Sequence, residues 1–218
     1  MKLLVEVTQN IDVLSETTKS GNKAMYITGP FMEYNQKNRN GRIYSEQVMR
    51  KAVDRYVTEK VNNNCAYGEL DHPDGPKLNL KEACILITSL DMQPRGQVIG
   101  KARITETPNG NIVKGLIESG ANLGVSSRGL GSLKAGKDGA MEVQEDFRLV
   151  TASDVVADPS AHSAFVKGIY ENVEWIFNER TGEWAEVQRK RLKKMNMHQI
   201  AEAQKYIFEE FLKNLSNK

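Results

Sequence analysis

The fold is decided by residues 83–107, where "ACILITSLDM" (83–92) and "QVIGKARITET" (97–107) each predict a β-strand. An Asn-Gly pair at 109–110 then indicates a hairpin turn before a further strand-like run. The other strand-like runs lie at residues 3–7, 24–33, 111–119 and 141–161. Because strands outnumber helices, we expect an α+β fold. It would be a β-barrel or a strongly curved, mainly antiparallel sheet with flanking helices and a C-terminal helical tail.

One helix is predicted upstream of these strands. Ser45 can cap a helix whose first turn contains Glu46, where the helix dipole favours a negative charge. Apolar residues then recur at helical spacing, namely Val48, Ala52, Val53, Tyr56 and Val57. This pattern predicts one amphipathic helix over residues 46–60.

The chain changes character near residue 180. "FNERTGEWAEVQ" (177–188) predicts a polar hairpin or linker, and "RKRLKK" (189–194) has five cations in six positions. In the tail that follows, one helical stripe contains Ile200, Ile207, Phe208, Phe211, Leu212 and Leu215. We therefore expect a main domain over residues 1–180, and a basic linker with an amphipathic helical tail over residues 181–218.

The composition limits the classes of function. Hydrophobic residues make up 39% of the 218 and charged residues 27%, which suffices for a packed core. The net charge of +2 argues against a dedicated nucleic-acid binder. No apolar run approaches the ~20 residues of a membrane span, and the first residues do not resemble a secretory signal. Cys65 and Cys84 lack a C-x-x-C motif, so we expect buried thiols in a reducing cytoplasm.

Three histidines are available for chemistry. His72, in "GELDHPDG", precedes a proline that disfavours helix, so we expect it in an extended segment or turn at an exposed edge. His162 follows a turn signal in "DPSAHSAF", and His198 lies in the tail. A zinc site needs three or four ligands, and the sequence has no compact Cys/His set. We therefore predict no metal and no cofactor.

The stretch "GVSSRGLGSL" (124–133) places two serines and an arginine between glycines, as a hydrogen-bonding turn would. It lacks the spacing and lysine of a P-loop, and its register does not fit a G-x-S-x-G elbow. Asp154, in "TASDVVADP", lies near the end of an apolar run, where a turn-capping role is one interpretation. From residue types alone, a Ser-His-Asp hydrolase is another.

Four motifs resemble a known family, and they occur in its order. They are "NRNGRIYSEQVMRKAVDRYV" (38–57), "GELDHP" (68–73), "GVSSRGLGS" (124–132) and "SDVVADPSAH" (153–162). Over residues 25–168 the chain resembles the prohead core proteases of T4-like tailed bacteriophages. That family is related to the herpesvirus assemblins, which are β-barrel serine proteases acting inside immature capsids. The resemblance implies that residues 1–180 are a serine protease domain.

The resemblance also implies roles for individual residues. The catalytic histidine of the family falls on His72, and its nucleophile falls on Ser126, the first serine of "VSSRG". A third group must fix the imidazole, and we expect Asp154 to do so. His162 is the alternative third member, because assemblins use a second histidine in that block.

An acyl-transfer enzyme also needs donors for the developing oxyanion. We expect a loop whose glycines allow a tight turn towards the substrate, with donors from the backbone N–H groups of Ser127, Arg128 and Gly129. The Ser127 hydroxyl is expected to support this loop by hydrogen bonding. For the side chain of Arg128, a salt-bridged surface position is the alternative.

The resemblance implies cleavage after glutamate, in contexts of Leu or Ile, any residue, Glu and a small residue. "IAEA" (200–203) matches, so we expect a zymogen that cleaves itself between Glu202 and Ala203. "LIES" (116–119) also matches, but we expect a strand to protect it.

The implied substrates are the phage scaffold or core proteins and the major capsid protein. The expected location is the cytoplasm of the infected bacterium, inside the immature prohead. The sequence does not predict the oligomeric state, and a homo-oligomer is one alternative. No membrane and no specific nucleic acid is expected as a partner. The alternative function is a catalytically silent scaffold or tube-like structural protein of the prohead. The retained His72, Ser126 and Asp154 count against that alternative.

Overall fold

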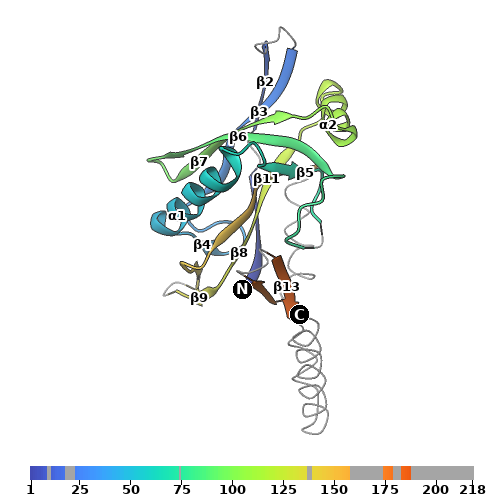
Figure 1. Cartoon of the computed structure of the whole chain (residues 1–218). Helices are drawn as coiled ribbons and strands as arrows, with labels where there is room; N and C mark the ends of the chain where they lie inside the picture. Colours follow the sequence, from blue (N-terminus) through green and yellow to red (C-terminus); the bar gives the residue numbers. More distant parts are fainter. Residues whose placement is uncertain are drawn as a thin grey trace, which may run out of the picture.

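The computed structural model of the chain describes residues 1–8, 11–17, 23–73, 75–136 and 139–157, and the backbone of 174–178 and 183–187. It has the mixed α+β character that the sequence predicts, with many strands and few helices (Figure 1). The tail expected to form a C-terminal helix lies outside these residues.

The larger sheet is antiparallel throughout and has the strand order β2-β3-β7-β6-β5. Its strands are β2 (Asp12–Thr17), β3 (Lys23–Glu33), β5 (Tyr67–Glu69), β6 (Ala83–Gln93) and β7 (Gln97–Ile104). The register shifts in the β3–β7, β6–β7 and β5–β6 pairs. Such bulges bend a strand and increase its twist, and Figure 1 shows β6 and β7 curving across the molecule. The strands predicted at 83–92 and 97–107 are confirmed, although the second ends at Ile104.

A second sheet has β8 as its central strand, with the order β1-β8-β11. Its strands are β1 (Lys2–Thr8), β8 (Gly124–Gly131) and β11 (Arg148–Val156), and both pairs are antiparallel. A small sheet, β4-β10-β9, consists of β4 (Arg42–Ile43), β9 (Leu133–Ala135) and β10 (Met141–Val143). A separate hairpin of β12 (Glu174–Asn178) and β13 (Glu183–Val187) confirms the hairpin alternative predicted for this region, and β12 lies beside β1.

The two main sheets meet at a seam but do not close into a ring. At the seam, Leu70 forms one parallel bridge with Val155 of β11, and the Asp71 N–H donates to the Val155 carbonyl at 2.8 Å. On the other side, the Thr8 hydroxyl donates to the Phe31 carbonyl at 3.4 Å, but no strand pairing among the described residues joins β1 to β3. The barrel alternative is therefore wrong for the described chain, and a curved antiparallel sheet fits the structure.

Helix α1 (Glu46–Tyr56), extended by the π-helical turn η1 (Val57–Val61), confirms the helix predicted over residues 46–60. The Ser45 hydroxyl caps it by accepting a hydrogen bond from the Val48 N–H at 3.2 Å. The buried side of the helix consists of Val48, Met49, Ala52, Val53 and Tyr56. Tyr44 and Phe147 pack edge to face beside this core, with ring centroids 5.0 Å apart.

Helix α2 (Pro108–Glu118) replaces the predicted hairpin turn and strand over 109–119, so that prediction is wrong. The Thr107 hydroxyl accepts a hydrogen bond from the Gly110 N–H at 3.2 Å, and Pro108 occupies the start of the helix, where its fixed φ fits. The Asn-Gly pair therefore lies in the first helical turn. A Cβ on Gly110 would lie 2.0 Å from the Thr105 carbonyl oxygen, so the loop before α2 leaves no room for a side chain there.

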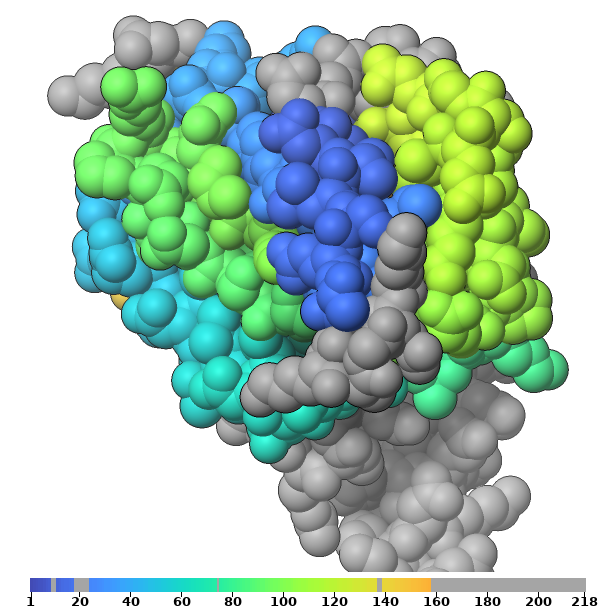
Figure 2. Space-filling model, turned by 90° about the horizontal axis from the view of Figure 1, so that it is seen from above, coloured from blue at the N-terminus to red at the C-terminus, as the bar shows by residue number. Residues whose placement is uncertain are grey.

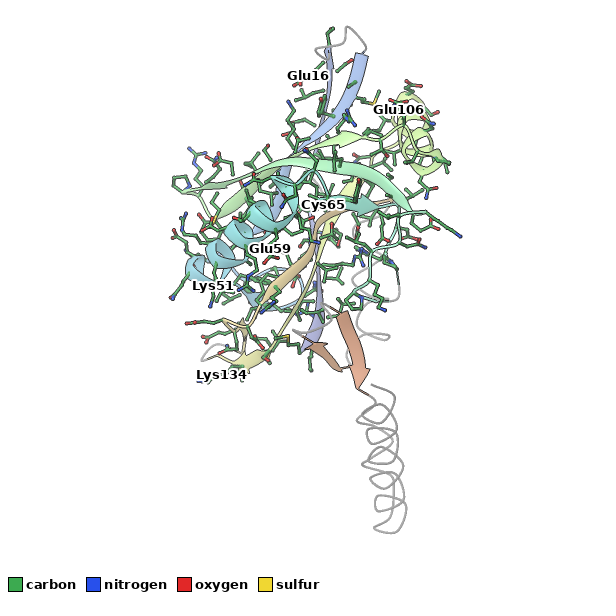
Figure 3. All side chains as sticks on the ribbon, in the orientation of Figure 1. Glu16, Lys51, Glu59, Cys65, Glu106 and Lys134 are labelled. Atoms are coloured by element: carbon green, nitrogen blue, oxygen red, sulfur yellow. The ribbon has the colours of Figure 1, made fainter. Side chains whose placement is uncertain are left out.

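Helix α2 lies on the outside of the molecule. Figure 2 shows it in yellow-green, to one side of the dark blue N-terminal segment, and Figure 3 labels Glu106, which lies 2.6 Å from Lys114 Nζ of the helix. Val113 faces the core, whereas Leu116 is exposed. The motif "LIES" thus ends an exposed helix, and the expected protection by a strand is wrong.

Candidate functional site

His72 follows β5 in a turn that starts with Asp71, whose φ of 65° places it in the left-handed region. Its backbone N–H donates to Asp71 Oδ1 at 2.9 Å. Only 3% of the His72 side chain is exposed, so the expected exposed position does not hold for the ring. The ring Nδ1 lies 3.1 Å from Asp154 Oδ2. Since a carboxylate only accepts, Nδ1 carries the proton in this contact, and Nε2 is the basic nitrogen of the neutral ring.

Ser126 and Asp154 lie opposite each other on neighbouring strands. They are Cα partners in the register of β8 with β11, and both are fully buried. Directly opposed residues of an antiparallel pair project from the same face of the sheet. The Ser126 hydroxyl donates to the Glu6 carbonyl at 3.0 Å. The structure thus brings His72, Asp154 and Ser126 to one face of the smaller main sheet.

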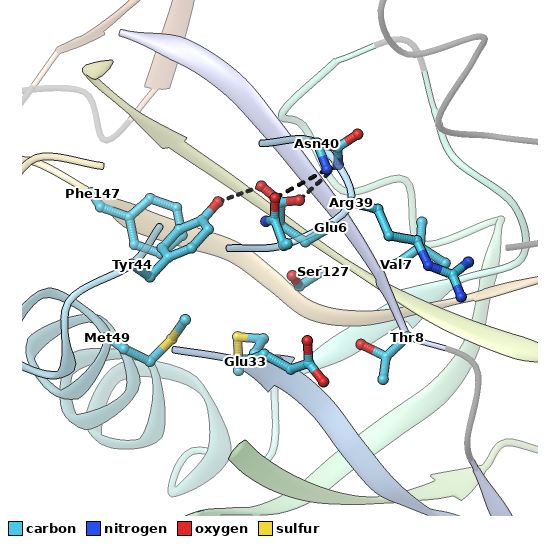
Figure 4. A pocket seen from close by; sticks show the side chains of 12 residues that line it. Glu6, Val7, Thr8, Glu33, Arg39, Asn40, Tyr44, Met49, Ser127 and Phe147 are labelled. Atoms are coloured by element: carbon cyan, nitrogen blue, oxygen red, sulfur yellow. Dashed lines mark hydrogen bonds between the residues drawn. The ribbon is translucent and has the colours of Figure 1, made fainter. Parts of the chain in front are cut away.

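Ser127 lies on the opposite face, because side chains alternate along a strand. It borders a small pocket whose walls include Glu6, Tyr44, Met49 and Phe147 (Figure 4). The Glu6 carboxylate accepts hydrogen bonds there from the Tyr44 hydroxyl at 2.8 Å and from Asn40 at 2.7 Å. Burial, and then the charge of Glu6, raise the pKa of Tyr44 well above its ordinary range. The two adjacent serines therefore lie in different environments, with Ser126 on the side of Asp154 and Ser127 beside this pocket.

The stretch 124–131 is a strand, so the loop expected there is wrong. β8 is paired with β1 along one edge and with β11 along the other. Its glycines make room for packing rather than a turn. A Cβ on Gly129 would lie 2.3 Å from the Phe147 ring, and one on Gly131 would lie 3.2 Å from it. The N–H groups expected to bind an oxyanion are therefore part of a sheet.

Arg128 is fully buried on the same side as Ser126 and Asp154, so the surface alternative for its side chain is wrong. Its Nε lies 2.5 Å from Asp154 Oδ2, its Nη2 forms an ion pair with Glu69, and its Nη1 donates to the Gly75 carbonyl at 2.8 Å. Burial acts to lower the pKa of Arg128, but Asp154 and Glu69 raise it above its ordinary value. The guanidinium therefore stays charged.

Glu69 is a buried carboxylate that the sequence analysis missed. Its Oε1 accepts a hydrogen bond from the Asn79 N–H at 2.5 Å, and its own N–H donates to Asp154 Oδ1 at 2.9 Å. Burial raises the pKa of Glu69, although the Asn79 N–H and Arg128 act in the opposite direction. The signal was present in "GELDHP", because a glutamate that ends a strand three residues before a candidate histidine is close enough to share its site.

Other predicted residues stay untested by the geometry. His162, Glu202 and Ala203 lie outside the described residues.

Among the residues that are described, no three His, Cys, Asp or Glu side chains gather in a way that could hold a metal ion. In that same part of the chain, no helix combines the length and apolarity needed to cross a membrane.

Three comparisons with known proteins identify the family of this chain. A family model described as prohead core protein serine protease matches residues 5–174. The sequence is similar to the prohead core protein protease of Enterobacteria phage T4, with 40% identity over 145 residues, 65% of this chain and 68% of that protein. The structure is similar to that of the bacteriophage T4 capsid assembly protease, with a TM-score of 0.69 and 32% identity, covering 72% of this chain and 98% of the other. The residues matched by the family model include His72, Ser126 and Asp154.

Proposed function

This chain belongs to the prohead core protein serine protease family, and we propose that Ser126, His72 and Asp154 form its catalytic triad. It is a protease of phage prohead assembly. The observation that supports the triad is the 3.1 Å contact between His72 Nδ1 and Asp154 Oδ2, with Ser126 directly opposite Asp154 on β8. A buried carboxylate that accepts from Nδ1 fixes the tautomer that leaves Nε2 as the base.

In the proposed reaction, His72 Nε2 takes the hydroxyl proton of Ser126 as Oγ attacks the scissile carbonyl carbon. The imidazolium then gives that proton to the leaving amine, and the carbon–nitrogen bond breaks. A water, deprotonated in the same way, releases the acyl group from Oγ. A serine hydroxyl has one proton, and here it is donated to the Glu6 carbonyl, so the hydroxyl must rotate towards His72 before it can react.

For the oxyanion we propose donors from the backbone of Ser127, Arg128 and Gly129. Strand pairing on both edges of β8 competes for these N–H groups. However, the register of β11 skips Ser127, because β11 is irregular between Thr151 and Asp154. The peptide directly after the proposed nucleophile is thus the place on β8 where the pairing with β11 is interrupted.

We further propose that the enzyme cuts after glutamate, where Leu or Ile stands two residues before it and Ala, Gly or Ser follows. Its substrates would be scaffold or core proteins and the major capsid protein, inside the prohead in the cytoplasm of the infected cell. Residues 1–180 would be the protease domain. The tail over 181–218 would be shortened by self-cleavage between Glu202 and Ala203, which makes the full chain a zymogen.

The test is intact-mass analysis of the purified chain over time, for the wild type, Ser126→Ala and Ser127→Ala. Ser127→Ala is the matched control, because the two serines are neighbours on β8 with side chains on opposite faces. We expect the wild type and Ser127→Ala to lose residues 203–218 while Ser126→Ala stays whole.

A peptide containing "QIAEAQ" (199–204) and a fluorophosphonate probe complete the experiment. If the wild type neither cuts the peptide nor is labelled at Ser126, the protein is the catalytically silent scaffold instead. If Ser126→Ala still cuts and Ser127→Ala does not, the nucleophile is misassigned.

A further inference from the structure

We propose that Glu69 and Arg128 are positioning residues of the protease site, in which a buried carboxylate–guanidinium–carboxylate array both fixes Asp154 and balances the imidazolium formed on His72. The inference rests on the proposed triad and deepens it. Neither side chain touches the substrate in this scheme, because both act through Asp154. The side chains of Arg128, Glu69 and Asp154 are all fully buried.

The array leaves the Asp154 carboxylate with four donors. Oδ2 accepts from His72 Nδ1 at 3.1 Å and from Arg128 Nε at 2.5 Å. Oδ1 accepts from the Glu69 N–H at 2.9 Å and from Arg128 Nη2 at 3.3 Å. A carboxylate held by two donors on each oxygen cannot rotate without losing contacts in a buried place. The orientation of the His72 ring is therefore set through Asp154 by residues on β5 and β8.

The charges of the array explain why a second carboxylate is present. Arg128 alone would neutralise Asp154, and a buried imidazolium on His72 would then have no net counter-charge. With Glu69 ionised, Asp154, Arg128 and Glu69 together carry a net charge of −1. The proton that His72 takes from Ser126 brings these three groups and the imidazolium to neutrality, while the matching negative charge moves to the oxyanion on the substrate. A charge that is balanced only when His72 is protonated favours the transition state over the ground state.

Other groups near His72 do not upset this count. Cys84 and Tyr56 lie close enough to Asp154 for its charge to act on them, and burial raises the pKa of each to about 12, so both are neutral at neutral pH. Asp71 precedes His72 and accepts its backbone N–H, but it is exposed to solvent. Water screens an exposed charge much more than a buried one. Arg128 pairs with both Asp154 and Glu69, but its single positive charge balances only one of them. Glu69 therefore adds the second buried negative charge, which balances the imidazolium.

The experiment follows the titration of His72 by NMR in Ser126→Ala, which keeps the full chain uncut. With three histidines in the sequence, the imidazole signals can be assigned by substitution. We expect Glu69→Gln to lower the midpoint of the His72 titration by about one pH unit, the low end of shifts caused by one nearby charge. Glu69→Asp, which keeps the charge, should restore the midpoint to within a few tenths of a unit.

Asp146→Asn is the control variant. Asp146 is a carboxylate in the turn before β11, held by the Ser132 N–H at 2.9 Å and the Ser132 hydroxyl at 2.6 Å, with no hydrogen bond to the array. It should leave the midpoint unchanged. If Glu69→Gln does not fold, Glu69→Met removes the same charge without placing amide donors against Arg128.

Activity provides the second measurement, with Ser126 restored. A midpoint lowered by one unit corresponds to about tenfold less stabilisation of the imidazolium, so kcat/KM for the "QIAEAQ" peptide should fall about tenfold in Glu69→Gln. The acidic limb of its pH profile should move to lower pH. A role in folding alone would lower the melting temperature and leave both midpoint and limb in place, which overturns the inference. If the midpoint shifts but the wild type cuts nothing, the array stands and the protease function fails.

Discussion

Gly68 lets the two halves of the site approach each other, and its replacement by alanine tests this directly. A Cβ at position 68 would lie 1.9 Å from the Ser153 carbonyl oxygen and 2.7 Å from Ile85 Cγ1. The first of these atoms belongs to the backbone of β11, so it cannot move aside without moving the strand. We therefore expect Gly68→Ala to separate β5 from β11 at the seam.

The magnitude follows from two losses. Overpacking at a site that cannot relax costs roughly 1–3 kcal/mol. Separation also breaks the 2.9 Å hydrogen bond from the Glu69 N–H to Asp154, and a hydrogen bond to a charged group contributes about 1.5–3 kcal/mol. Together the two losses lower the free energy of unfolding by about 2.5–6 kcal/mol. In a domain of this size that corresponds to a drop in melting temperature of roughly 5–24 °C.

The assay is urea unfolding, combined with cleavage of the "QIAEAQ" peptide. Gly115→Ala is the matched control, because Gly115 lies in the interior of α2 and a Cβ there would meet nothing within 4 Å. Alanine is favoured over glycine in a helix by about 1 kcal/mol, so this control should gain stability and keep its activity. If Gly68→Ala is as stable and as active as the wild type, the close approach of β5 and β11 is not what holds the site.

Three further predictions concern separate features. Ser45→Ala should cost about 1 kcal/mol in urea unfolding and leave peptide cleavage unchanged, because it removes only the cap of α1. In the native protein at pH 8, iodoacetamide should modify the half-buried Cys65 and not the buried Cys84, because burial raises the pKa of the Cys84 thiol to about 12. Equal alkylation rates of the two thiols would show that Cys84 is accessible. Arg128→Met should cost about 3–5 kcal/mol at neutral pH. Arg128 is one of the groups that lower the pKa of Glu69, so its removal leaves burial to raise that pKa further. The folded variant then binds a proton more readily than the unfolded chain, and its free energy of unfolding should rise as pH falls. A free energy of unfolding in urea that is no higher at pH 5 than at pH 8 contradicts this.

Elements defined by local pattern could be predicted from the sequence. The runs at 83–92 and 97–107 became β6 and β7, and the capped apolar pattern after Ser45 became α1. The helix over 108–118 was missed because an Asn-Gly pair was interpreted as a hairpin turn. A threonine cap followed directly by proline is itself a helix start, and that signal at Thr107 and Pro108 proved decisive.

The shape of 124–131 could not be predicted from its residue types. Glycines and serines favour turns in isolation, but here the Phe147 side chain occupies the space that side chains at positions 129 and 131 would need. Phe147 lies more than fifteen positions away along the chain, so the packing partner that turns these glycines into strand residues is not visible locally. Tertiary contacts override local preference in such cases.

The residues of the candidate triad could be named from the sequence, whereas the array around Asp154 could not. His72, Ser126 and Asp154 stand in motifs that resemble a family. The role of Glu69 and Arg128 depends on a contact between their side chains, which are 59 positions apart in the sequence. Nothing in either motif says that a buried guanidinium joins the two carboxylates. That contact depends on the seam where β5 meets β11.

The site therefore belongs to neither sheet alone. Ser126, Arg128 and Asp154 are placed by the smaller sheet, while Glu69 and His72 come from the last strand of the larger sheet and the turn after it. Apart from the single bridge between Leu70 and Val155, the groups that join the sheets there include buried charges, which are costly to separate once they are away from water. Closing the seam and assembling the proposed triad with its array are thus the same structural event, so we expect a change that separates β5 from β11 to lower activity as well as stability.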